Sequence, residues 1–328
     1  MGEFLFKTAE MNKLDQKIVR AEAEWRRYRY ENAGVRESAK LFGTALKRSF
    51  RKRMRCAAVN MHIPGKKKSF ISTYDVNKVN TVVSLTSTKS RLEHIFPTLA
   101  SLVSQRLKPD LIVLWLGKGE EYPVQLIKMI RAMGIKIKFR EDLGPHTKYY
   151  YAFRKYKNDL IMTVDDDIIY HEKMIEELYR TYQKNKNCVI ARRVNKMRFD
   201  QERKLLKYTD WIWEYRDAKA PAYDLLATGV GGVLYPPELI SEIQRDDKAF
   251  LKACPMADDI WLKFCELSKD IKVCAVEASA YYLDVINSKT QKISLSSVNV
   301  DRGKNDEQIK ACIEYFGMQD DICERVLE

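Results

Sequence analysis

The chain has 328 residues, enough for one large domain or two modest ones. Hydrophobic residues make up 45% and aromatic residues 11%, which excludes an intrinsically disordered chain. No apolar run approaches the roughly 20 residues that span a bilayer, and residues 1–20 lack a signal-peptide core. The seven cysteines have no zinc or redox spacing, so we expect reduced thiols in a cytoplasmic protein.

The net charge of +13 is concentrated near the start of the chain. Residues 1–78 hold 19 Lys and Arg against 8 Asp and Glu, whereas the rest of the chain holds 39 against 37. The sequence therefore predicts a basic helical extension with a linker (1–78), a main domain (79–280) and a C-terminal helical or irregular segment that packs on it (281–328).

The extension is predicted to form helices at residues 9–30 and 37–56. The second helix has an apolar stripe, with its basic residues largely on other sides, which is typical of a helix on an anionic membrane surface. Residues 36–68 are the segment expected to make that contact, peripherally on the inner face of the cell membrane. Alternatively, the stripe packs on the main domain or on a second subunit as a homo-oligomer. Nucleic acid is the least favoured partner.

From residue 79 the pattern alternates between apolar strands and amphipathic helices. Strands are predicted at 79–85, 111–116, 135–139 and 160–164, with helices at 92–104, 124–133 and 147–156 between them. Continuous apolar strands of this kind indicate an α/β fold with a mostly parallel central sheet covered by helices on both faces. In such sheets, ligands bind outside the carboxyl ends of the strands.

Three consecutive aspartates, Asp165, Asp166 and Asp167, follow the fourth strand. Alternation places Asp165 and Asp167 on one side and Asp166 on the other. Neighbouring carboxylates repel each other unless a divalent cation lies between them, so the triplet is a candidate metal site. The alternative is an acidic loop or a cap for the following helix.

Polar residues follow the other strands at the same edge. The hydroxyls of Thr86 and Ser87 and the carboxylate of Asp142 could hold a ribose or a base, and Arg91 and Lys148 could meet phosphates. Neither a Gly-x-Gly-x-x-Gly nor a Gly-Lys-Ser/Thr motif occurs, which excludes the dinucleotide fingerprint and the P-loop.

Six blocks in this order resemble the GT-A fold glycosyltransferases, in particular a bacterial family-2-like group of surface-polysaccharide biosynthesis. The resemblance covers roughly 60% of the chain, from about residue 79 to residue 269. The blocks lie at 84–87, 109–116, 144–148, 163–168, 228–237 and 254–261. The resemblance implies a Rossmann-like GT-A fold and a nucleotide-sugar donor, with a UDP-sugar preferred. It also implies that Asp165 and Asp167 of the Asp-x-Asp motif hold Mn²⁺ or Mg²⁺, with Asp165 and Asp166 beside the nucleotide. No histidine follows His171, so the third protein ligand is not identified.

The resemblance places a second acidic site at Asp258 and Asp259. Asp259 is the expected base that deprotonates the acceptor hydroxyl, and Asp258 orients it or contacts the acceptor. The alternative is that both cap a helix at 260–267. Gly231, Gly232 and Trp213 are expected beside the donor sugar and the acceptor, although a structural turn and a core aromatic would explain them too.

The sequence thus predicts a metal-dependent, inverting glycosyltransferase that moves a sugar from a nucleotide to a glycan. A surface polysaccharide, in lipid-linked form as one candidate, is the expected acceptor. Two alternatives stay open. The first is a nucleotidyltransferase of sugar phosphates, although no Gly-rich basic loop follows the first strand. The second is a non-catalytic basic adaptor on a transferase fold.

Overall fold

A computed structural model describes residues 74–244, 248–277, 284–285 and 303–327. The predicted helices at 9–30 and 37–56, and the basic segment 36–68 with its expected membrane and oligomer contacts, lie outside these residues. In the described part, no helix is long and apolar enough to cross a membrane. The six cysteines of the described ranges form no disulfide with one another, and all six are buried.

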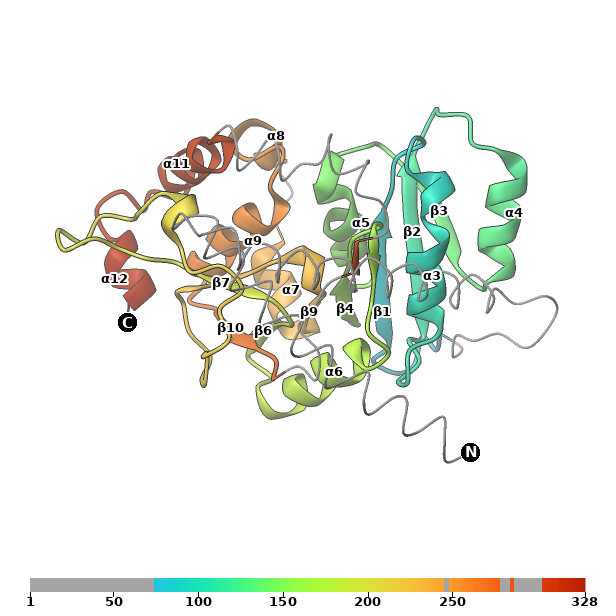
Figure 1. Cartoon of the computed structure of the whole chain (residues 1–328), viewed down its shortest axis with the longest axis horizontal. Helices are drawn as coiled ribbons and strands as arrows, with labels where there is room; N and C mark the ends of the chain where they lie inside the picture. Colours follow the sequence, from blue (N-terminus) through green and yellow to red (C-terminus); the bar gives the residue numbers. More distant parts are fainter. Residues whose placement is uncertain (1–73, 245–247, 278–283, 286–302, 328) are drawn as a thin grey trace, which may run out of the picture.

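A seven-stranded sheet forms the centre of the molecule, in the order β10-β6-β9-β4-β1-β2-β3 (Figure 1). Strands β1, β2, β3 and β4 pair in parallel, as do β6 and β10, whereas β9 runs antiparallel to both of its neighbours. The predicted mostly parallel sheet is therefore confirmed. Its strands are β1 (Thr81–Thr86), β2 (Leu111–Gly117), β3 (Lys136–Arg140), β4 (Leu160–Thr163), β6 (Cys188–Ala191), β9 (Val233–Tyr235) and β10 (Lys272–Ala275).

Two small ribbons flank the sheet. The first pairs β5 (Ile168–Ile169) with β11 (Asp284–Val285), and the second pairs β7 (Val194–Lys196) with β8 (Leu225–Ala227). The helices are α3 (Phe96–Val103), α4 (Val124–Ala132), α5 (Thr147–Lys155), α6 (Met174–Lys184), α7 (Pro237–Ile243), α8 (Phe250–Ala253), α9 (Asp258–Leu267), α11 (Lys304–Phe316) and α12 (Ile322–Leu327).

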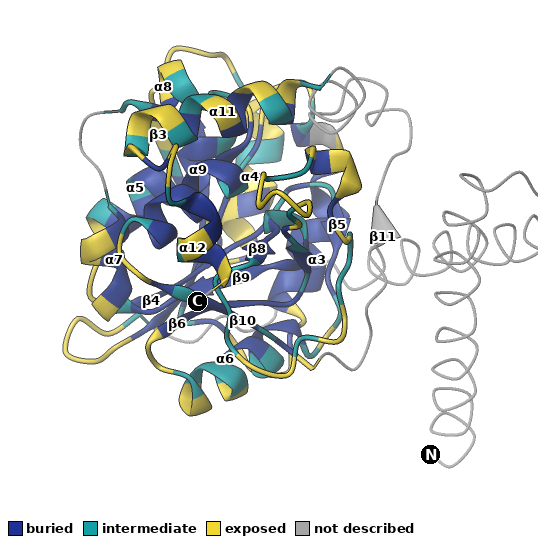
Figure 2. Cartoon of the chain, turned by 90° about the vertical axis from the view of Figure 1, so that its left-hand side faces the viewer, coloured by how far each residue is buried: buried dark blue, intermediate teal, exposed yellow. Residues whose placement is uncertain are grey.

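Helices cover both faces of the sheet because each central strand is apolar on both sides. Along β1, Val82 belongs to one hydrophobic cluster and Val83 to another, and Ile161 and Met162 of β4 divide in the same way. All four are fully buried. Successive side chains of a strand point to opposite faces, so the continuous apolar run predicted this double burial. Figure 2 shows the buried sheet enclosed by helices whose outer sides are exposed.

The predicted boundaries differ from the structure in three informative places. The predicted helix 92–104 is a 3-10 turn, Leu92–His94, followed by α3, with Ile95 as N-cap and Pro97 in the first turn. Proline lacks a backbone N–H and is favoured at a helix start, so the α-helix begins only there. Strand β4 ends one residue before Val164, and α9 begins at Asp258 rather than at residue 260.

Helix α11, near the end of the chain, packs beside α9 (Figure 1). The ring of Trp261 on α9 lies 5.3 Å from those of Tyr315 and Phe316 on α11. Burial of large aromatic rings is a strong apolar contribution to packing, so α11 is firmly attached to the helix that carries the second acidic pair.

Candidate active site

The strand-end cluster, Asp165, Asp166 and Asp167, follows β4 at the carboxyl edge of the sheet. Arg91 donates to Asp166 Oδ1 at 2.5 Å and lies 2.8 Å from Asp167 Oδ2. Ser87 donates its hydroxyl to Asp166 Oδ2 at 2.5 Å. Asp166 is buried, and this burial raises its pKa to about 6, although Arg91 and Ser87 oppose the shift. Asp166 is therefore satisfied inside the protein, whereas Asp165 and Asp167 remain partly exposed.

Lys148 connects the two acidic sites that the sequence predicts separately. It lies on α5, and its Nζ is 2.7 Å from Asp165 Oδ1 and 3.0 Å from Asp258 Oδ2. Its side chain is only 6% exposed. Burial disfavours the charged ammonium, but the two carboxylates outweigh this cost and raise the pKa of Lys148. One buried cation thus neutralises one carboxylate of each site.

Asp165 and Asp167 can supply carboxylate oxygens to a hard divalent cation. Both are partly exposed, and burial and the neighbouring Asp165 raise the pKa of Asp167. Added positive charge between them would relieve that repulsion, which fits Mn²⁺ or Mg²⁺. Among the described residues, no group of three or more His, Cys, Asp or Glu side chains is arranged to hold a metal. The fit therefore rests on two carboxylates, and further oxygen ligands would have to come from outside the described side chains.

The helix-start pair, Asp258 and Asp259, occupies the first turn of α9. The N-cap is Ala257, so neither aspartate caps the helix in the way that the alternative interpretation required. Asp258 is buried against Lys148, whereas Asp259 is partly exposed and accepts a hydrogen bond from the Ile260 backbone at 2.9 Å. Burial and the adjacent Asp258 raise the pKa of Asp259 to about 7. A carboxylate with that pKa is well matched to general-base chemistry near neutral pH.

Tyr208 and its neighbours lie beside the helix-start pair. Burial raises the pKa of the Tyr208 hydroxyl, and the charge of Asp259 adds to the shift. The backbone amides of Tyr208 and of Met256, three residues before Asp259, both donate to side chains of α11. Trp213 packs on Tyr208 with ring centres 5.4 Å apart, and its Nε1 donates to the Tyr208 carbonyl at 3.1 Å. Trp213 is half-buried. This aromatic group forms a wall next to Asp259, and Tyr208 is a member that the sequence did not single out.

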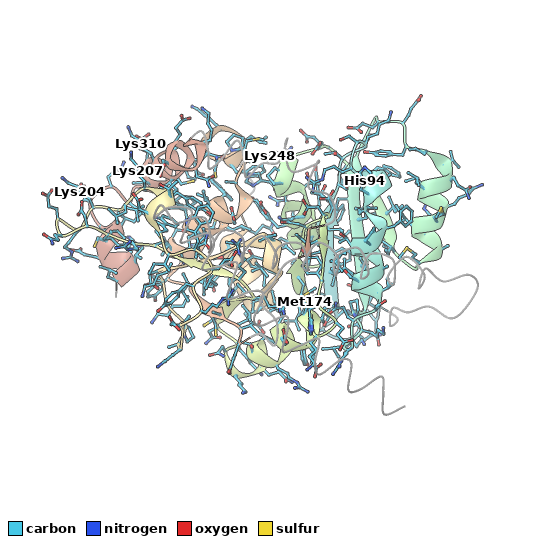
Figure 3. The ribbon with its side chains drawn as sticks, viewed as in Figure 1. His94, Met174, Lys204, Lys207, Lys248 and Lys310 are labelled. Atoms are coloured by element: carbon cyan, nitrogen blue, oxygen red, sulfur yellow. The ribbon has the colours of Figure 1, made fainter. Side chains whose placement is uncertain are left out.

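The glycines of the 229–232 turn have different neighbours. A Cβ on Gly231 would lie 2.6 Å from Arg193 Cβ, and one on Gly232, whose φ is +90°, would lie 3.2 Å from Met174 Sδ. Met174 is labelled in Figure 3. A Cβ on Gly229 would lie 2.9 Å from Lys148 Nζ and 3.6 Å from Asp165 Oδ1. Gly229 is thus the glycine whose missing side chain faces the charged site, whereas at Gly231 and Gly232 that side is packed against protein.

The remaining predicted nucleotide contacts have local structural partners. Thr86 donates its hydroxyl to the Trp115 carbonyl at 3.1 Å. Asp142 is exposed and accepts a hydrogen bond from the Gly144 backbone at 2.9 Å, which shapes the turn before α5. Neither contact brings Thr86 or Asp142 to Lys148 or the aspartates. Their roles at a nucleotide stay predictions.

His146, one of the four histidines of the chain, has a structural role that the sequence did not predict. Its Nε2 lies 2.7 Å from the Cys254 carbonyl, its Nδ1 lies 2.9 Å from the Tyr149 hydroxyl, and its ring stacks on Phe250. Burial lowers its pKa to about 3. The neutral ring must then donate from Nε2 to the carbonyl and accept at Nδ1. His146 therefore anchors the loop that leads to Asp258.

Residues 86–233 match the family model described as Glycosyl transferase family 2. This segment is similar to the family 2 glycosyltransferases. The match contains the strand-end cluster, Lys148 and the glycine turn, and it confirms the resemblance that the six sequence blocks predict. The helix-start pair and α11 lie beyond the matched residues.

Two solved structures of glycosyltransferases resemble the chain at low identity. S. aureus TarS, residues 1–349 in complex with UDP, has a TM-score of 0.42 and 16% identity over 60% of this chain and 59% of that one. The mannosyltransferase PcManGT from Pyrobaculum calidifontis, in complex with GDP-Man and Mn²⁺, has a TM-score of 0.43 and 11% identity over 73% of this chain and 64% of that one. The chain thus covers less than two thirds of either. The comparison with curated proteins gave no match.

Proposed function

We propose that the chain is a metal-dependent, inverting glycosyltransferase that moves a sugar from a nucleotide to a glycan hydroxyl. The observation that carries this function is the bridge made by Lys148, at 2.7 Å from Asp165 and 3.0 Å from Asp258. It joins an acidic cluster at the end of a parallel strand to an acidic pair at the start of a helix. The acidic cluster is suited to binding a diphosphate together with its metal ion, and the acidic pair is suited to deprotonating the acceptor hydroxyl.

The strand-end cluster would hold the donor diphosphate. Asp165 and Asp167 would hold Mn²⁺ or Mg²⁺, which when bound stabilises the negative charge that the leaving diphosphate gains. Arg91 and Ser87 hold Asp166 in place and so fix the chain between the two metal-binding carboxylates. Gly229 leaves room for Lys148 to reach Asp165. A UDP-sugar is the first donor to test.

The helix-start pair would activate the acceptor. Asp259 takes the proton of the acceptor hydroxyl as its oxygen forms a bond to the anomeric carbon. The bond from that carbon to the diphosphate breaks, and the nucleoside diphosphate leaves with the electron pair. Asp258 stays neutralised by Lys148, so only Asp259 is placed to accept the proton. Attack from the face opposite the leaving group gives inversion.

Release of the nucleoside diphosphate tests this function directly. The full chain would be incubated with a panel of nucleotide-sugars and simple glycan acceptors, with Mn²⁺, with Mg²⁺ and with a chelator. Metal-dependent release of nucleoside diphosphate with inversion at the anomeric carbon is the expected result. Release of pyrophosphate in a parallel incubation with nucleoside triphosphates and sugar 1-phosphates would instead indicate a nucleotidyltransferase, and no turnover with any of these substrates would favour a non-catalytic adaptor.

The acceptor class can be tested in the same assay. A surface-polysaccharide intermediate on a lipid carrier is the acceptor we propose, presented at an anionic membrane that residues 36–68 contact. The chain with and without residues 1–68 would be compared on free glycan and on the same glycan in anionic vesicles. The truncated chain should lose vesicle binding and its transfer rate on the vesicle-bound glycan, but it should keep its rate on the free glycan. Equal vesicle binding by both forms would contradict the membrane contact.

A further inference from the structure

The helix α11 contacts both of the loops that border Asp259. The backbone N–H of Tyr208 donates to Asp306 Oδ1 at 2.7 Å, and the backbone N–H of Met256 donates to Gln308 Oε1 at 2.8 Å. Tyr208 belongs to the aromatic wall, and Met256 lies three residues before Asp259. Two segments about fifty residues apart in sequence are thus fastened to one helix.

The spacing on α11 explains how one helix can reach both loops. Residues two apart on a helix point in different directions, so Asp306 and Gln308 serve neighbours on separate sides. Gln308 is buried, and its Nε2 donates to the Lys304 carbonyl at 3.2 Å, which fixes the orientation of its amide. Ile309 and Cys312 are buried on the same helix, and the aromatic contacts with Trp261 hold it against α9.

The loop before Asp258 is held from its other side as well. His146 donates to the Cys254 carbonyl at 2.7 Å, so residues 254–257 lie between an anchor next to α5 and an anchor on α11. The strand-end cluster is held by other residues, since its carboxylates pair with Arg91, Ser87 and Lys148. Loss of the α11 contacts should therefore move the acceptor side and leave the donor side in place.

We propose that Asp306 and Gln308 are positioning residues, and that α11 sets the distance between Asp259 and the Tyr208–Trp213 wall, where the acceptor sugar binds. This inference rests on the proposed function, and it assigns part of the acceptor site to a helix outside the residues that match the family. A misplacement of about 1 Å in a reacting pair can cost about 100-fold in rate, so two backbone hydrogen bonds are enough to matter.

The variants isolate each hydrogen bond. Gln308→Met fills a similar volume without the acceptor oxygen, and Asp306→Ala removes the other acceptor. Asp306→Asn keeps an oxygen that can accept from Tyr208, so it should restore the wild-type behaviour. Lys310→Ala is the matched control, because Lys310 is exposed on the outer side of the same helix (Figure 3).

Steady-state kinetics of transfer, with donor hydrolysis and nucleotide binding measured alongside, give the first test. Gln308→Met and Asp306→Ala should raise the acceptor KM and lower the transfer kcat by about 10- to 100-fold together. Donor hydrolysis and the Kd for nucleoside diphosphate with Mn²⁺ should stay within about twofold of wild type. Unchanged acceptor kinetics, or an equal loss of donor binding, would overturn the positioning role.

Hydrogen–deuterium exchange of the full chain tests the same contacts without turnover. The amide of Tyr208 should exchange faster in Asp306→Ala and that of Met256 in Gln308→Met, while peptides covering residues 160–170 keep their wild-type exchange. Unchanged exchange at both amides would overturn the inference. A wild-type chain that turns over no nucleotide-sugar would contradict the proposed function instead. The exchange result would then still show whether Asp306 and Gln308 hold the two loops.

Discussion

The strand-end cluster and the helix-start pair are both acidic, but their surroundings differ. Arg91 contacts two of the three strand-end aspartates and Lys148 contacts the third. In the helix-start pair, Lys148 forms an ion pair with Asp258, and the Asp259 carboxylate accepts a hydrogen bond from a backbone amide. Cations stabilise ionised carboxylates, whereas burial beside another carboxylate favours the protonated form. The first site therefore suits the binding of charge, and the second suits the transfer of a proton.

Removal of the shared cation should have the largest effect, because it damages both sites. In Lys148→Met, Asp165 and the buried Asp258 lose their partner, and loss of one member of a buried ion pair costs about 3–5 kcal/mol. We expect a matching fall in the free energy of unfolding, measured by chemical denaturation, and no detectable transfer.

The double variant Lys148→Met with Asp258→Asn sharpens this expectation. It should regain part of the lost stability, because the uncompensated buried charge is gone. Lys155→Met, on the exposed part of the same helix, is the control and should change stability little. A Lys148→Met variant as stable as wild type would show that the two sites are not coupled through this side chain.

Asp259→Asn should affect only the second site. The amide cannot take a proton from the acceptor, so the transfer kcat should fall by about 10²- to 10⁴-fold. Nucleotide binding should persist, because the strand-end carboxylates keep their ion pairs with Arg91 and Lys148 in this variant. Transfer and nucleotide affinity would be measured on the same preparations, with the exposed Asp320→Asn as control. Transfer by Asp259→Asn near the wild-type rate would exclude it as the base.

The pH dependence follows from the raised pKa of Asp259, about 7. The base must be ionised, so kcat should rise with pH and level off above about pH 7. The apparent pKa of this rise belongs to the interacting Asp258–Asp259 pair. Stability should change in the opposite direction. The folded state holds this proton more tightly than the unfolded chain, so its contribution to the free energy of unfolding falls as pH rises from about 4 to about 7. Asp259→Asn should remove both effects, and an unchanged rate profile would contradict the assignment.

The glycine turn allows a smaller comparison between catalysis and packing. Gly231→Ala places a Cβ 2.6 Å from Arg193 Cβ and 2.9 Å from its backbone nitrogen, and such overpacking costs about 1–3 kcal/mol. Gly229→Ala instead meets the flexible end of Lys148, so it should lower kcat with a smaller change in stability. Denaturation and kinetics of the two variants would separate these outcomes, and the reverse order would show that Gly229 does not serve the charged site.

Local patterns in the sequence predicted much of this arrangement. The apolar run 160–164 followed by three aspartates predicted a buried strand that ends at an acidic edge, and β4 confirms the strand. The helix predicted at 124–133 is confirmed as α4, and Gly134 beyond it has a φ of +84°, a conformation that favours glycine at a helix end. These features depend on residues within one element, where periodicity and turn chemistry are informative.

The contacts between distant segments could not be predicted in this way. Lys148 meets Asp165 and Asp258 through side chains on three different elements, and no spacing rule connects them. Residues 306 and 308 lie outside every recognised block, and their partners are backbone amides, which any residue type provides. The antiparallel β9 likewise depends on pairing with β4 and β6, strands that precede it by more than forty residues.

The division of labour between the two acidic sites is tested most directly by nucleotide binding in two matched variants. Asp167→Asn and Asp259→Asn each remove one carboxylate charge, and titration calorimetry with nucleoside diphosphate and Mn²⁺ would measure the affinity of each. We expect a loss of nucleotide affinity of at least about tenfold in Asp167→Asn and wild-type affinity in Asp259→Asn, with transfer by Asp259→Asn lowered by about 10²- to 10⁴-fold. Equal affinities in the two variants, or weaker binding in Asp259→Asn, would contradict the assignment of the metal and the donor to the strand-end cluster.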